Sequence, residues 1–143
     1  MTQTPSEILR EGCAVLDPVM KEYGFSFLEE PAGRGSGGPF ASAAYVRSDW
    51  KLEISFRFSL GLVTYQFGET SIDHEAYMRA VLGGSRGNRY PGFSNDPLSA
   101  FQDLAFDLRN FAKAFLEADS GQFARYAAEA EKWKRIPGIA RIP

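Results

Sequence analysis

The chain contains one cysteine and one histidine among its 143 residues. A single cysteine cannot close an internal disulfide, and a single histidine cannot build a histidine-rich metal site, so we expect neither a bound metal nor another cofactor. Charges of one sign are not in excess either, because 16 Lys and Arg face 18 Asp and Glu. This balance gives no general attraction for nucleic acid or for an anionic membrane. The composition therefore disfavours both of these partners.

Long apolar runs are also absent. The apolar stretches are interrupted well before the ~20 residues that a membrane-spanning helix needs. The first seven residues, Met-Thr-Gln-Thr-Pro-Ser-Glu, carry neither the basic segment nor the apolar segment of a secretory signal. Together with the single free thiol, these features predict a cytoplasmic protein without membrane contact.

Aromatic residues are abundant by contrast, with 12 Phe, 6 Tyr and 2 Trp in a chain that is 44% hydrophobic. A chain of this length usually forms one domain and buries roughly 70% of its unfolded surface. We expect a single domain over residues 1–134. Residues 135–143, which repeat the tripeptide Arg-Ile-Pro, are then a C-terminal tail that either frays or packs on a neighbour.

Hydrophobic periodicity divides the domain into a helix, a sheet and further helices. Thr4 and Glu7 form a capping box for a first helix that ends at Gly24, and Pro18 either kinks this helix or begins a second short one. Strands are expected over 25–30, 40–48, 50–59 and 62–67, with a flexible glycine-rich loop at 31–38. Because the connections between strands are short, the pairing should be antiparallel.

Helical spacing returns after the strands. Ser71 is the expected cap of a helix to about residue 82, Asp96 and Pro97 begin a long amphipathic helix, and residues 122–134 form the last one. The predicted fold class is therefore α+β. It has an N-terminal helix, an antiparallel meander of three or four strands, and three C-terminal helices packed on one face of the sheet.

This layout resembles small uncharacterised bacterial α+β domains in which a leading helix ends in Gly-Phe and a strand meander follows. The residues that carry the resemblance are Tyr23-Gly-Phe25, Tyr45-Val-Arg47, Glu53-Ile-Ser-Phe56, Gly61-Leu-Val-Thr-Tyr65 and Tyr90-Pro-Gly-Phe93. The resemblance implies the fold class and no particular activity.

Two residues could carry acid–base or nucleophilic chemistry. His74 has a side chain that titrates near neutrality, and Glu75 follows it, but adjacent helical positions point about 100° apart. Cys13 lies beside the apolar face of the first helix, without a local basic partner to activate it. For both residues a structural role is favoured over a catalytic one, and we assign no catalytic residues.

Residues 84–95 form the longest segment without periodicity. Within them, Arg86, Arg89, Tyr90 and Phe93 combine two guanidinium groups with two aromatic rings. These residue types are enriched where proteins bind one another. The alternative is that Tyr90 and Phe93 anchor the segment in the core while the arginines remain solvated.

These observations favour a non-catalytic interaction module, of the immunity-protein or chaperone kind, that binds another protein through the 84–95 loop. The alternative is a ligand-binding protein or small enzyme whose pocket lies between sheet and helices and uses His74, Arg57 and Tyr65 as polar contacts. A sheet edge or the C-terminal tail would be the interface of a homodimer.

Overall fold

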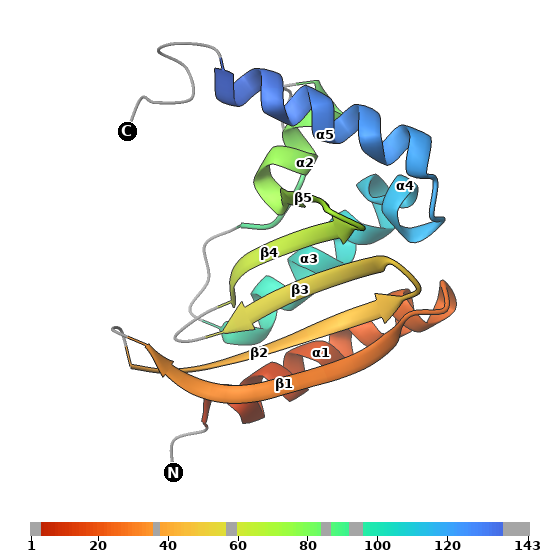
Figure 1. Cartoon of the computed structure of the whole chain (residues 1–143). Helices are drawn as coiled ribbons and strands as arrows, with labels where there is room; N and C mark the ends of the chain where they lie inside the picture. The colour runs from red at the N-terminus through yellow and green to blue at the C-terminus, as the bar shows by residue number, and fades with distance from the viewer. Residues whose placement is uncertain (1–3, 36–37, 57–59, 84–86, 92–95, 136–143) are drawn as a thin grey trace.

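The computed structural model describes residues 4–35, 38–56, 60–83, 87–91 and 96–135. Figure 1 shows one sheet with helices behind it and beyond one of its edges. The predicted α+β class with an N-terminal helix and an antiparallel meander is confirmed. In the described residues the sheet has five strands, in the consecutive order β1-β2-β3-β4-β5: Ser26–Gly35, Gly38–Arg47, Trp50–Phe56, Leu60–Phe67 and Thr70–Asp73.

The first hairpin is longer than the sequence predicts. Residues 31–38 were expected to form a flexible loop, but β1 continues to Gly35 and β2 starts at Gly38. The register shifts between Glu30 and Gly33, and beyond the shift Gly33 pairs with Phe40 and Gly35 with Gly38. A bulge of this kind absorbs one extra residue and lets pairing resume, which is why the glycines do not end the strand.

The fifth strand was not predicted. Gly68, with φ of +57°, turns the chain after β4, and Thr70–Asp73 then pairs back along it. The following helix α2 (His74–Leu82) is therefore capped by Asp73, whose carboxylate accepts a bond from the Ala76 amide, and not by Ser71. Ser71 lies in the strand, opposite Gln66.

The N-terminal helix α1 (Pro5–Glu22) begins at the predicted capping box, in which Thr4 and Glu7 bond each other reciprocally. Pro18 lies inside this one helix, so a separate second helix does not form. The helix ends before Gly24, which has a φ of +84° that glycine adopts without strain. Phe25 then folds back, and its amide donates to the Met20 carbonyl.

Four helices follow the sheet in the described residues, rather than three on one face: α2, α3 (Pro97–Phe111), α4 (Lys113–Leu116) and α5 (Ser120–Arg135). Asp96 and Pro97 begin α3 as predicted. Helices α1 and α3 pack together behind the sheet, whereas α2 and α5 pack on each other beyond β5 (Figure 1). The expected long helix is interrupted at Ala112, which separates α3 from α4.

The two faces of the sheet differ in what covers them. On the face toward α1 and α3, which we call the covered face, the register aligns the buried side chains of Tyr45, Leu52, Tyr65 and Ile72. The next row along the strands lies on the opposite, open face and runs through Ala44, Glu53, Thr64 and Asp73. Alternation along strands therefore separates an apolar, aromatic surface from a mainly polar one.

Aromatic rings form the centre of the core. Phe115 of α4 stacks on Phe25 and meets Trp50, Tyr65 and Phe123 edge to face or tilted. Each ring contact of this kind stabilises a fold by about 0.5–1.5 kcal/mol beyond the stabilisation that comes from burying apolar area. The described aromatic residues thus join α1, the sheet and the C-terminal helices into one core.

Candidate binding site

A cavity of about 360 Å³ lies where the start of β4, the β5–α2 junction and the 87–91 segment meet. The residues that line it include a glycine, aliphatic side chains, acidic side chains and aromatic rings. Its lining residues are Gly61, Leu62, Val63, Asp73, His74, Glu75, Tyr90 and Pro91. The volume lies toward the lower end of the range found for ligand sites, so the cavity has room for a side chain or a small molecule.

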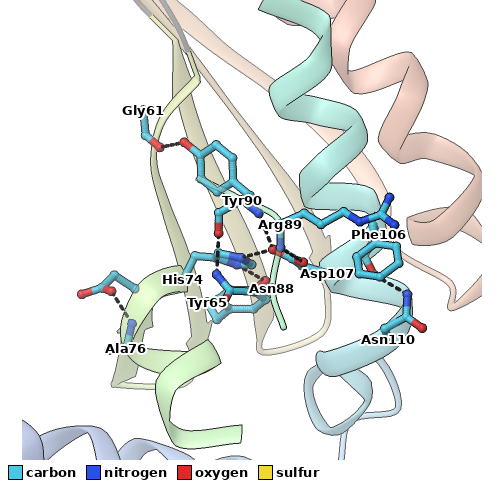
Figure 2. Close-up of polar contacts among 11 residues, drawn as sticks. Gly61, Tyr65, His74, Ala76, Asn88, Arg89, Tyr90, Phe106, Asp107 and Asn110 are labelled. Atoms are coloured by element: carbon cyan, nitrogen blue, oxygen red, sulfur yellow. Dashed lines mark hydrogen bonds and ion pairs between the residues drawn. The ribbon is translucent and has the colours of Figure 1, made fainter. Parts of the chain in front are cut away.

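The wall made by Tyr90 and Pro91 is held in place by Asp107 of α3. This carboxylate is fully buried and accepts hydrogen bonds from three N–H groups (Figure 2). The Arg89 amide donates at 2.6 Å, the Tyr90 amide at 2.8 Å, and His74 Nε2 at 2.9 Å. One side chain therefore joins α3, α2 and the 87–91 segment, and a buried carboxylate with three donors is well compensated for its lost hydration.

His74 is 2% exposed, and both of its ring nitrogens are engaged. Because the Asp107 carboxylate can only accept, we assign the ring hydrogen to Nε2. Nδ1 then accepts from the Tyr65 hydroxyl at 2.7 Å. A histidine with this pair of bonds has no free nitrogen with which to take a proton from a ligand, so in this arrangement it orients the wall of the cavity rather than acting as a base.

Tyr90 lines the cavity, but it is only 7% exposed. Its single hydroxyl hydrogen is shared between the carbonyls of Leu60 and Gly61, at 2.8 and 2.5 Å, which ties the segment to the start of β4. Burial, with a smaller contribution from the negative charge of Glu75, raises the pKa of this phenol to about 12. Tyr90 is therefore both an anchor and a wall of the cavity.

Of the remaining residues predicted for the 84–95 loop, the structure describes Arg89. The exposed side chain of Arg89 lies over the Phe106 ring, with its guanidinium carbon 3.7 Å from the ring centroid. This cation–π contact directs the guanidinium toward α3. Arg86 and Phe93 lie outside the described residues.

Of the predicted pocket residues His74, Arg57 and Tyr65, the structure brings two together. Tyr65 is fully buried beneath His74, and burial raises the pKa of its hydroxyl well above its usual value. It does not line the cavity and reaches it only through His74. Arg57 lies outside the described residues.

Asp107 and Leu62 were not singled out from the sequence. Asp107 follows Leu104 by three positions and precedes Phe111 by four, so it lies on the apolar stripe of its helix. An acidic residue on such a stripe is a signal that it has buried partners, because an unpaired buried carboxylate is very costly. Leu62 carried no comparable signal, since its exposure depends on which elements cover β4.

Leu62 is 65% exposed and borders a second cavity as well. This cavity, of about 200 Å³, lies on the open face and is lined by Ser42, Glu53, Ile54, Ser55, Leu62 and Thr64. Thr64 is paired with Asp73 of the first cavity, so the two hollows are neighbours across β4 and β5. We call Leu62 with these two cavities the Leu62 surface.

Cys13 is 3% exposed, and burial raises the pKa of its thiol to about 12. Such a thiol is a poor nucleophile, which agrees with the structural role favoured for it. The described part of the chain also contains no group of three or more His, Cys, Asp or Glu side chains arranged to hold a metal ion. Within the same residues, every helix is too short or too polar to cross a membrane.

Comparison with known proteins gives no match: no family model fits the chain, and no curated protein or solved structure is detectably similar to it.

Proposed function

We propose that this protein is a non-catalytic interaction module that binds a partner protein through the Leu62 surface. One observation carries the proposal, namely that a 65% exposed leucine stands between two cavities. Protein interfaces concentrate their binding energy in a few side chains near the centre, which pack into desolvated hollows and are surrounded by a polar rim that excludes water. Leu62 with Ser55, Thr64 and Glu75 around it has this arrangement.

The chemistry of the site supports binding rather than catalysis. His74 donates to Asp107 and accepts from Tyr65, which leaves it no nitrogen for a substrate. The Cys13 thiol is buried, and its pKa is raised to about 12. The predicted contact loop retains a part in this proposal, since Tyr90 and Pro91 form one wall of the larger cavity.

The test is affinity capture from an extract of the source organism with immobilised wild-type protein and the variant Leu62→Asp. The matched control is Leu28→Asp, because Leu28 is another exposed leucine (49%) that lies on edge strand β1. Each captured protein is then purified and its dissociation constant measured by calorimetry. We expect Leu62→Asp to weaken a true partner at least tenfold, since a charge replaces the central apolar contact. Leu28→Asp should change binding less than twofold, and equal loss in both variants would refute the assignment.

A second candidate function is supported by the larger cavity itself, because about 360 Å³ is enough for a small ligand. A screen of metabolites by thermal shift separates the two functions. A ligand that raises the melting temperature of both wild type and Leu62→Asp would favour the small-molecule site. Such a ligand would bind through other lining residues of the cavity, among them His74 and Tyr90, so that its binding would survive the loss of the Leu62 side chain.

A further inference from the structure

We infer that the partner inserts an arginine side chain into the larger cavity of the Leu62 surface, beside Asp73 and Glu75. This inference rests on the proposed function, because it specifies the partner's chemistry at the same surface. Asp73, Glu75 and Tyr90 line the larger cavity, and none of its described lining residues is Lys or Arg. An elongated cation with an apolar stem is complementary to such a cavity.

Neither carboxylate has an ion pair within the described residues. Glu75 is exposed. The one hydrogen bond of the Asp73 carboxylate in the same residues is the capping bond that it accepts from the Ala76 amide. The smaller cavity differs, because its Glu53 is already paired with Lys51 at 3.1 Å. A partner's positive charge is therefore expected at the larger cavity rather than at the smaller one.

The start of α2 lies at the same place, and its dipole must be counted. A helix N-terminus contributes roughly half a positive charge. Asp73 and Glu75 are its N-cap and first-turn acid, and together they contribute two negative charges. The sum is still clearly negative, so capping the helix uses only part of the acidic charge. The influence of Glu75 reaches into the cavity, because its charge contributes to the raised pKa of Tyr90.

Arginine fits this lining through three kinds of contact. Its planar guanidinium can donate two parallel hydrogen bonds to the Glu75 carboxylate, and its flat face can lie against the Tyr90 ring. Its methylene stem would pack on Leu62 at the mouth of the cavity. The charge and the hydrogen bonds distinguish arginine from an uncharged side chain of the same shape.

The experiment titrates Nα-acetyl-arginine methylamide into ¹⁵N-labelled full-length chain and follows backbone amide shifts by NMR. The uncharged isostere, Nα-acetyl-citrulline methylamide, is titrated in parallel. We expect arginine to shift the amides of Leu62, Val63 and Glu75, with at least fivefold weaker binding for citrulline. Equal binding of the two compounds, or shifts confined to other residues, would overturn the inference.

Two variants, each of which removes one negative charge, show where the arginine compound binds. Glu75→Gln should weaken arginine binding about threefold to fivefold. Glu69→Gln, at an exposed position in the β4–β5 turn, should change it less than twofold. Unchanged binding in Glu75→Gln would contradict the inference.

The captured partner separates this inference from the proposed function. If Leu62→Asp abolishes partner binding while Glu75→Gln leaves it unchanged, the arginine contact is wrong and the proposed function stands. If Leu62→Asp has no effect on the partner, the proposed function fails, whatever the arginine probe does. Loss of partner affinity in both variants supports both the proposed function and the arginine contact.

Discussion

The two faces of the sheet use the same strands in opposite ways. On the covered face, the buried hydroxyls of two tyrosines are engaged within the chain: Tyr45 shares its hydrogen between the Cys13 carbonyl and the Asp17 carboxylate, and Tyr65 donates to His74. On the open face, Leu62 is exposed, and the carboxylate of Asp73 keeps capacity for further bonds. The buried hydroxyls of the covered face therefore have their hydrogen-bond partners within the chain, whereas Leu62 and the Asp73 carboxylate on the open face can make further contacts.

This difference is the reason for proposing a binding surface on the open face. An abundance of aromatic residues first suggests an aromatic binding surface, yet the rings of Tyr45, Tyr65, Tyr77 and Phe115 are fully buried. Even Tyr90, in the segment predicted to bind, has its hydroxyl bonded inside the protein. Substitutions on the covered face should therefore change stability, and substitutions at the Leu62 surface should change binding.

The largest effect is expected for Asp107→Ala. The substitution leaves His74 Nε2 and the amides of Arg89 and Tyr90 buried without their acceptor. We expect a loss of about 3–5 kcal/mol in the free energy of unfolding, measured by urea denaturation. The control Asp103→Ala changes a half-buried residue one turn earlier on α3 and should remain within about 0.5 kcal/mol of wild type. A loss below 1 kcal/mol for Asp107→Ala would show that the network contributes little.

Gly12→Ala should be the next most damaging change. Gly12 of α1 packs directly on Phe101 of α3, and an added Cβ would lie 2.3 Å from a ring carbon. The clash outweighs the better helix propensity of alanine, so we expect a net loss of about 2 kcal/mol. Gly121→Ala in α5 is the matched control, because the nearest atom to its added Cβ is 3.8 Å away. Chemical denaturation of both variants tests whether α1 and α3 are in close contact.

Tyr65→Phe removes one hydroxyl from the same network. His74 Nδ1 would then be buried without a donor, at a cost of about 1–2 kcal/mol. Tyr126→Phe, which changes a half-buried tyrosine on α5, should cost less than 0.5 kcal/mol. Thermal and urea unfolding give the comparison, and equal losses in the two variants would contradict the proposed role of the Tyr65 hydroxyl.

The covered face was the part of the molecule that the sequence could predict. Alternation along residues 50–58 places Leu52, Ile54 and Phe56 on one side, and all three are buried. Local signals also identified the ends of helices, as at Thr4 and Asp96. Strand alternation and helix caps depend on residues within a few positions of one another in the sequence, so they can be predicted from local sequence alone.

The site depended on contacts that no local pattern contains. His74 and Asp107 are 33 positions apart, and their pairing depends on how α2 and α3 are placed around the sheet. The fifth strand depended on a turn at Gly68, and without it the cap of α2 was assigned to Ser71 instead of Asp73. The exposure of Leu62 likewise follows from the positions of the helices, which leave the open face uncovered (Figure 1).

Alkaline pH should destabilise the fold through Cys13, which is buried on α1. Burial raises the pKa of this thiol to about 12, above the ordinary value of roughly 8.5 that the unfolded chain has. The stabilisation is therefore complete below about pH 8 and is lost as the pH rises toward 12, since the unfolded state releases the proton first. Between pH 8 and 10 the wild type should lose about 1–2 kcal/mol more stability than Cys13→Ala. Urea midpoints at the two pH values provide the measurement, and parallel loss in both proteins would exclude this source.

Leu62→Ala should have the smallest effect on stability and is the most direct test of the contrast between the faces. Leu62 is mostly exposed, so its truncation removes little buried area, and we expect a change within about 0.5 kcal/mol. Leu52→Ala, which truncates a fully buried leucine on neighbouring strand β3, should cost about 2–5 kcal/mol. Urea denaturation of the pair measures the difference directly. A large loss for Leu62→Ala would mean that this side chain stabilises the fold, and the reason for proposing it as a contact with a partner would then disappear.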